Sequence, residues 1–139
     1  MQDILALLED QGKRTHVFAA LDTLEYLRRS GRMNGALAGL GNLLQVKPLL
    51  KMYDGKPTAE RVRTRERATQ RLFEILDEVG ALERVAIVHT HSPDRVQELR
   101  QRAAPLLPED EILSVDITPV IGAHIGPGAV GFACIAAHK

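Results

Sequence analysis

The pattern of hydrophobic and polar positions divides the chain into alternating helical and extended stretches. A stripe of leucine and isoleucine at helical spacing predicts an amphipathic helix over residues 3–11, ended by Gly12. The β-branched and aromatic run at 15–21 predicts a strand. Asp22 then fits the N-cap of a short helix that Gly31 ends, because glycine readily takes a left-handed conformation at that position.

The middle of the chain predicts a small-residue segment, a hairpin and a long helix. Glycine, alanine and leucine mix over 35–44, which as a helix would have a face smooth enough for another helix or an alkyl chain to approach closely. A hairpin is predicted over 46–63, with an Asp-Gly turn and with Pro57 in an edge strand. Thr64 fits the N-cap of an amphipathic helix that Gly80 ends.

Two more strands, a helix and a glycine-rich stretch complete the pattern. Strands are predicted over 84–89 and 112–117, with a helix between them that begins at Ser92-Pro93. The stretch 117–131, ITPVIGAHIGPGAVG, predicts a shaped loop before an apolar final strand. Strands that alternate with helices, interrupted by one hairpin, predict an α/β (α+β) fold in which helices pack on a mixed β-sheet in two layers.

Length and composition predict one globular domain over 1–139. The 18 basic and 18 acidic residues give a formal net charge of zero, which argues against nucleic acid as the main partner. The single cysteine, Cys134, excludes an internal disulfide and fits a reducing compartment. Acidic residues inside the first apolar run are unlike a signal peptide, so we expect a cytoplasmic protein without a transmembrane segment.

Histidines are the first candidate functional side chains. His124 stands among glycine and apolar residues, where it could donate to a carboxylate or another anionic oxygen with help from the amides of Gly126 and Gly128. Alternatively, its ring is bonded to the backbone of a tight turn. His89 and His91 share a face if the strand continues, and with His124 as a third ligand they could bind the metal of a hydrolase or phosphotransferase.

Arginines form the second candidate group, in the run RVRTRERA at 61–68. Most of these arginines are explained as solvent-exposed basic residues at the start of a helix. In a strand, Arg61 and Arg63 would share a face, and if that face meets the His124 stretch, one arginine can hold a carboxylate or phosphate in a bidentate fork. We find no nucleophile–base–acid motif in the sequence. We therefore expect a binding module instead of an enzyme, with no cofactor and no metal; a protein-interaction half-domain is a further alternative.

Three blocks of the sequence together resemble one family. DTLEYLRRSGRMNGALAGLGNLLQVKPLL, RVRTRERA and TPVIGAHIGPGAVG are similar, in this order, to the C-terminal lobe of the DegV family of bacterial fatty-acid-binding proteins. The likeness covers the chain from about Asp3. The family's N-terminal lobe has no counterpart in this sequence.

The resemblance implies a long-chain fatty acid held in a tunnel between two α/β lobes, and in some members presentation of its carboxylate to a fatty acid kinase. The H-x-G-P-G histidine matches His124 and the R-T arginine matches Arg63, both associated with the carboxylate. The same stretch would supply backbone support through Gly122, Gly126 and Gly128. The implied tunnel wall includes Leu37, Leu40, Leu44 and Ile121. We expect the apolar face to meet the absent lobe or a second copy of the chain.

Overall fold

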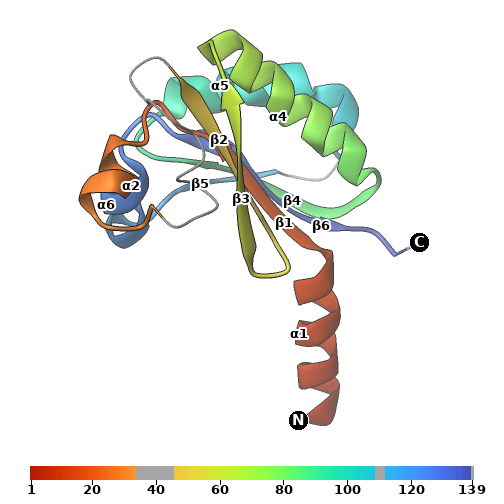
Figure 1. The fold of residues 1–139 in the computed structure, drawn as a ribbon. Coiled ribbons are helices and arrows are strands. Elements are labelled where there is room, and N and C mark those ends of the chain that lie inside the picture. Colours follow the sequence, from red (N-terminus) through yellow and green to blue (C-terminus); the bar gives the residue numbers. More distant parts are fainter. Residues whose placement is uncertain (34–45, 109–111, 139) are drawn as a thin grey trace.

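Six strands form one sheet within the described part of the chain, residues 1–33, 46–108 and 112–138 of a computed structural model (Figure 1). They are β1 Thr15–Ala20, β2 Lys47–Tyr53, β3 Lys56–Val62, β4 Leu82–His89, β5 Leu113–Asp116 and β6 Val130–Ala136. Their order across the sheet is β3-β2-β1-β6-β4-β5. Neighbours are antiparallel except β4 and β5, which are parallel, so the sheet is mixed as predicted. The predicted segment 35–44, with Leu37, Leu40 and Leu44, lies outside the described residues.

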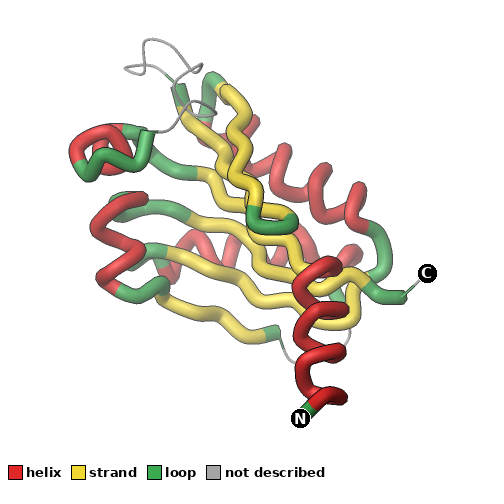
Figure 2. Tube along the Cα trace, turned by 60° about the horizontal axis from the view of Figure 1, so that its bottom comes forward, coloured by secondary structure: helices red, strands yellow, loops and turns green. Residues whose placement is uncertain are grey.

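Helices cover one face of the sheet and flank its two ends. They are α1 Gln2–Arg14, α2 Glu25–Arg29, α4 Arg65–Val79, α5 Pro93–Ala103, the short 3-10 turn η2 Ala104–Leu106, and α6 Pro119–Ile125. Helices α4 and α5 lie on one face (Figure 1), whereas α2 and α6 pack together at one end and α1 projects from the other (Figures 1 and 2). This is the predicted two-layer α/β (α+β) architecture.

The main core lies between the sheet and the α4–α5 layer. Phe18 of β1 and Phe132 of β6 are paired in register, with ring centroids 5.8 Å apart. Leu72 and Leu76 of α4 pack against this core and are almost fully buried. Each leucine buried in this way contributes roughly 1.5–3 kcal/mol. The apolar stripe predicted for α4 is therefore confirmed as the core-facing side of that helix.

Local turn signals place several element ends where the sequence predicts them. Asp54 and Gly55 both have positive φ, 49° and 68°, as a two-residue hairpin turn between β2 and β3 requires. The hydroxyl of Thr64 accepts from the amide of Arg67 at 3.1 Å and caps α4. Gly31, at φ 71°, ends α2. Pro57 lies in β3, an edge strand, as expected.

Two predicted helix ends are wrong. Helix α1 continues through Gly12 to Arg14, whose guanidinium pairs with Asp10 at 2.5 Å and with Glu83 at 2.6 Å and so ties the last turn to the sheet. Asp22 does not cap α2, which begins at Glu25. Tertiary contacts override the local capping signal at Asp22, because arginines bind its carboxylate, as described below.

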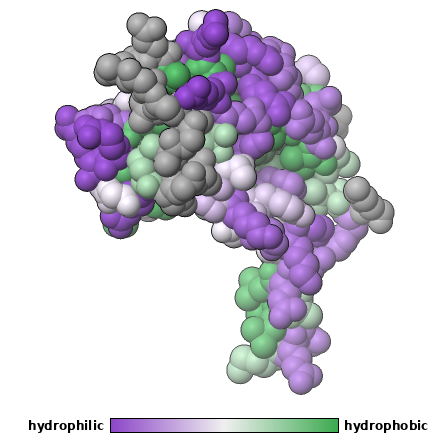
Figure 3. Space-filling view, viewed as in Figure 1, coloured by the Kyte–Doolittle hydropathy of each residue, from purple (hydrophilic) through white to green (hydrophobic). Residues whose placement is uncertain are grey.

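The second face of the sheet is apolar and carries little cover among the described residues. Val17 and Met52 point away from the core and are 37% and 43% exposed, and on β5 Leu113 is 64% exposed. The apolar stripe of α1 is exposed as well, and none of the residues of α1 is buried. Figure 3 shows this stripe as a hydrophobic ridge on the projecting helix. Two separate apolar surfaces therefore lack a partner within the described chain.

Candidate functional site

The glycine-rich stretch is a helix followed by a tight loop, so the prediction of a loop throughout 117–131 is wrong. Thr118 is extended and Pro119 occupies the first turn, an arrangement that starts a helix without losing a backbone hydrogen bond. The amide of Gly126 donates to the carbonyl of Gly122 at 2.8 Å. Gly126 has φ 79°, a conformation that stops α6. The loop of residues 126–129 then leads into β6.

His124 lies in the last turn of α6, and its ring is half-buried. Its Nδ1 atom is buried and has no hydrogen-bond partner among the described residues. The alternative of a ring bonded to the backbone is therefore not supported for this nitrogen. The second ring nitrogen, Nε2, is the other hydrogen-bonding atom of this side chain and is the one we consider for a ligand.

Thr90, at the end of β4, holds the loop 126–129 from the sheet side. Its buried hydroxyl donates to the carbonyl of Gly126 at 2.7 Å and accepts from the amide of Ala129 at 2.8 Å. Its backbone amide donates to the carbonyl of Ala129 at 2.9 Å, and its carbonyl accepts from the amide of Gly128 at 3.0 Å. Thr90 was not among the site residues predicted from the sequence. Its position between two histidines was the available signal, but the residue itself is unremarkable in sequence.

A carboxylate and two arginines hold the loop from the other side. Asp22 pairs with Arg65 at 3.1 Å and lies 3.7 Å from Arg95. The Arg95 guanidinium donates to the carbonyl of Gly128, and burial lowers the pKa of Arg95. A Cβ atom on Gly128 would collide with the Asp22 carboxylate. Arg65, which pairs with Asp22, therefore reaches the loop only indirectly.

Gly126 makes a second close approach, to the ring of Tyr26 on α2. A Cβ atom on Gly126 would collide with that ring. The packing joins α2 to the end of α6 and makes a smaller apolar cluster around Leu24 and Ala129. Glycine is thus required at Gly126 both for its positive φ and for space.

Arg63, the predicted partner of His124, lies exposed between β3 and α4. It borders a hollow whose lining is Glu60, Arg61, Val62, Arg63, Arg67 and Arg71. Across the described ranges, no hydrogen bond or ion pair joins Arg63 to His124. Joint binding of one carboxylate by these two residues stays a prediction.

His89 and His91 do not form the predicted metal face with His124. Strand β4 ends at His89, and His91 turns away with φ 51° and a side chain 95% exposed. The Nδ1 atom of His89 accepts from the amide of Ser92 at 3.1 Å. Within the part of the chain that the structure describes, no three His, Cys, Asp or Glu residues could hold a metal ion. The metal-dependent alternative is therefore not favoured.

A hollow of about 550 Å³ lies beside α6. Gly122 and Gly126 border it without side chains, and Asp116 contributes a carboxylate that accepts from the amide of His91 at 3.0 Å. Its lining is Thr90, His91, Asp116, Ile117, Thr118, Pro119, Gly122, Gly126 and Pro127. Ile121 of α6, predicted in a tunnel wall, is 55% exposed on the surface of the described chain.

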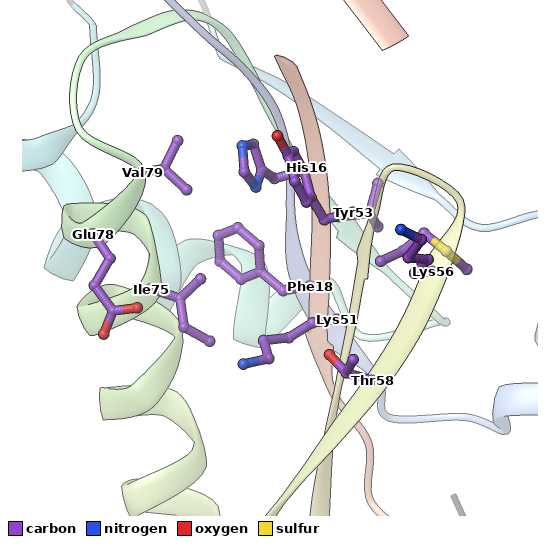
Figure 4. Close-up of a pocket in the computed structure, with 11 residues that line it drawn as sticks. His16, Phe18, Lys51, Tyr53, Lys56, Thr58, Ile75, Glu78 and Val79 are labelled. Atoms are coloured by element: carbon purple, nitrogen blue, oxygen red, sulfur yellow. The ribbon is translucent and has the colours of Figure 1, made fainter. Parts of the chain in front are cut away.

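A second hollow, of about 480 Å³, lies between α4 and the strands β1 and β2 (Figure 4). His16 and Tyr53 stack there with centroids 4.5 Å apart, over an apolar floor that includes Phe18 and Ile75. Lys51 points into the hollow but is already paired with Glu60 at 2.5 Å. This hollow is at the end of the sheet where β1 starts, away from α6, so it is not part of the His124 site.

Comparison with known proteins places the fold and these motifs in one family. A family model for uncharacterised proteins of the DegV family matches residues 1–137. The chain belongs to the DegV family. It is 34% identical over 135 residues to Protein DegV of Bacillus subtilis and 38% identical over 135 residues to a DegV domain-containing protein of Streptomyces coelicolor. These matches cover 94% of this chain and 48% of each relative, so this DegV chain spans about half the length of the curated relatives it matches.

Solved structures agree with this assignment. The fatty-acid-binding DegV family protein of Streptococcus agalactiae superposes with a TM-score of 0.84 at 30% identity, covering 99% of this chain and 50% of that protein. A DegV family protein of Thermus thermophilus, described by its fatty acid binding, superposes with a TM-score of 0.84 at 32% identity. This match covers 99% of this chain and 51% of that protein. The family and the predicted DegV-like lobe are therefore confirmed. In the described part of this DegV chain, no helix is long and apolar enough to cross a membrane.

Proposed function

We propose that this DegV chain is one half of a fatty-acid-binding site, with the ligand's carboxylate bound by His124 and Arg63. The observation that carries the proposal is the half-buried His124 ring, whose Nδ1 is buried without a partner at the end of a firmly held helix. An N–H donor at Nε2 of this ring would suit a carboxylate, because a hydrogen bond to a charged acceptor is stronger than one to a neutral acceptor. The solved relatives at 30% and 32% identity that are named for fatty acid binding support this choice of ligand.

The acyl chain would lie against apolar surface that this half only partly provides. Each buried methylene contributes about 0.8 kcal/mol, so a wall on one side yields a fraction of the affinity of a closed tunnel. Ile121 and the small-residue segment 35–44 are the wall residues we propose. The exposed apolar surfaces of α1 and of the sheet would meet a second lobe, or in its absence a second copy of the chain.

The chain contributes binding and no chemical step in this proposal. A carboxylate held by an imidazole and a guanidinium would be fixed in place, which suits its presentation to a second protein. Phosphorylation of that carboxylate by a fatty acid kinase is the use we propose. The exposed position of Arg63 would allow it to contact both the carboxylate and an incoming phosphoryl group.

Substitution of the two residues tests the carboxylate site. We expect His124→Ala and Arg63→Ala each to weaken palmitate binding about tenfold or more, because a hydrogen bond to a charged group contributes roughly 1.5–3 kcal/mol. Binding of hexadecanol, which has the same chain without the charge, should change little. Both ligands can be followed by NMR titration of the labelled chain.

Arg84→Ala is the matched control, since this arginine is exposed and does not line the hollow beside α6. A loss of palmitate binding in Arg84→Ala as large as in the two test variants would contradict the proposal. Unchanged palmitate affinity in both His124→Ala and Arg63→Ala would disprove the assignment of the carboxylate site.

A further inference from the structure

Thr90 stands where the sheet meets the loop that follows α6. It is 5% exposed and follows the last residue of β4, a strand with two partners in the sheet. Its single hydroxyl proton is used on the carbonyl of Gly126, because the same oxygen accepts from the amide of Ala129. Both bonds span more than thirty residues of sequence, so they are tertiary contacts that local structure does not supply.

The carbonyl of Gly126 belongs to the residue that ends α6. The amide of this glycine closes the last turn of the helix at the carbonyl of Gly122. His124 lies within that turn, two residues before the anchored carbonyl. A helix of 7 residues is too short to be stable alone, so the contacts at its ends determine where its side chains lie.

We propose that Thr90 is a positioning residue that sets the orientation of the His124 imidazole by holding the carbonyl of Gly126. The inference rests on the proposed carboxylate site and adds a residue to it that touches no ligand. Without the hydroxyl, the carbonyl of Gly126 and the amide of Ala129 both lose a buried partner. The two backbone bonds of Thr90 remain, so the loop stays attached while the end of α6 loosens.

Thr90→Val removes the hydroxyl and keeps the shape of the side chain. We expect the affinity for palmitate to fall about threefold to tenfold, as the loss of a well-aligned hydrogen bond from His124 to the ligand implies, and the affinity for hexadecanol to stay the same. Thr90→Ser keeps the hydroxyl and should restore palmitate affinity. A merely structural role would weaken both ligands together.

Thr69→Val is the matched control. Thr69 is also buried, and its hydroxyl donates to the carbonyl of Arg65 inside α4 at 3.0 Å, away from α6. It should lower stability without changing the preference for palmitate over hexadecanol. If Thr69→Val changes that preference as much as Thr90→Val does, the inference is overturned.

The imidazole resonances of His124 give a readout that needs no ligand. We expect them to shift in Thr90→Val and to return in Thr90→Ser; Thr90→Ala serves the same comparison if valine prevents folding. If the unmodified chain binds acid and alcohol equally, the proposed function fails, and the role of Thr90 is then decided by these resonances alone. Unchanged resonances in a folded Thr90→Val chain would overturn the inference.

Discussion

Position 128 requires glycine, because a side chain there would displace the Asp22 carboxylate. The residue has φ 83°. Asp22, from the loop after β1, and Arg95 of α5 both lie against it, and Arg65 of α4 pairs with Asp22. The loop is therefore clamped by charge on one side and by the Thr90 hydroxyl on the other. Rigidity of this kind matters for a ligand site, because a displaced donor loses most of its hydrogen bond.

Gly128→Ala is predicted to destabilise the fold by roughly 1–3 kcal/mol, because alanine is strained at positive φ and its methyl group meets Asp22. Gly12→Ala is the control. It lies inside α1 with open space around it and should be neutral or stabilising by up to about 1 kcal/mol. Urea unfolding measures both. If the two variants are equally stable, Asp22 and the arginines do not hold the loop at Gly128 as we infer.

The sequence is informative about single residues where the constraint is local. Positive φ at Gly31 follows from the rule for residues after a helix C-terminus, whereas the helix that Gly126 ends was not predicted. The contacts of Asp22 and Thr90 do not follow from such rules, because their partners lie 43 and 36 residues away along the chain. Sequence pattern marks His124 as unusual, but for Thr90 it offers only the two flanking histidines, which do not show that Thr90 holds the helix of His124.

Among the elements, the hairpin and α4 are joined by a line of ion pairs. Arg71 of α4 pairs with Glu60 of β3 at 2.8 Å and with Glu78 at 2.6 Å, and Lys51 of β2 pairs with Glu60 at 2.5 Å. Glu60 is 29% exposed, so these charges are only partly screened by water. Hydrogen bonds from Arg71, and then from Lys51, lower the pKa of Glu60 to about 2.

The Glu60 network predicts a loss of stability in acid. Folding lowers the pKa of Glu60. The stabilisation that ionised Glu60 contributes is therefore fully present above its ordinary pKa of 4.5 and is lost as the pH falls toward 2. Glu60→Gln should cost roughly 1–3 kcal/mol at neutral pH and flatten the pH dependence between those limits. Thermal unfolding across this range, with Glu9→Gln on the exposed α1 as control, measures the effect. If the thermal stability of Glu60→Gln depends on pH as that of the unmodified chain does, the prediction is wrong.

Elements with strong local signals were predicted well, whereas helix α6, whose signals are mixed, was not. The hairpin has an Asp-Gly turn, and α4 has a cap and a regular apolar stripe, so both were found. Helix α6 begins with Pro119 and contains Gly122, and it has no buried face to give a helical period. Its formation depends on packing against α2, which sequence pattern does not contain.

At the scale of the whole molecule, the arrangement leaves apolar surface on two sides. Among the described residues, the helix layer of α4 and α5 covers one face of the sheet (Figure 2), and α1 projects with Ile4, Leu5, Leu7 and Leu8 each more than half exposed. The net charge of zero offers little repulsion between copies. Both observations agree with a chain that spans half of its relatives.

We predict that the isolated chain self-associates through α1. Sedimentation velocity should show a concentration-dependent increase in mass, which Leu5→Glu combined with Leu8→Glu should abolish. The double variant should keep its fold, because no residue of α1 is buried. Glu substitutions at Gln2 and Lys13, on the polar side of the helix, are the control. A monomeric wild-type chain at high concentration would disprove the prediction.

The place of β6 has a consequence for how the protein is made. This strand is the last of the six along the chain, yet it lies between β1 and β4 and joins them. During synthesis, the hairpin and β1 can pair early, but the sheet stays in two separate parts until Ala136 has left the ribosome. Until then β1 presents an unpaired edge next to Phe18, which is an aggregation hazard. Burial of that edge therefore waits for the strand that is made last of the six.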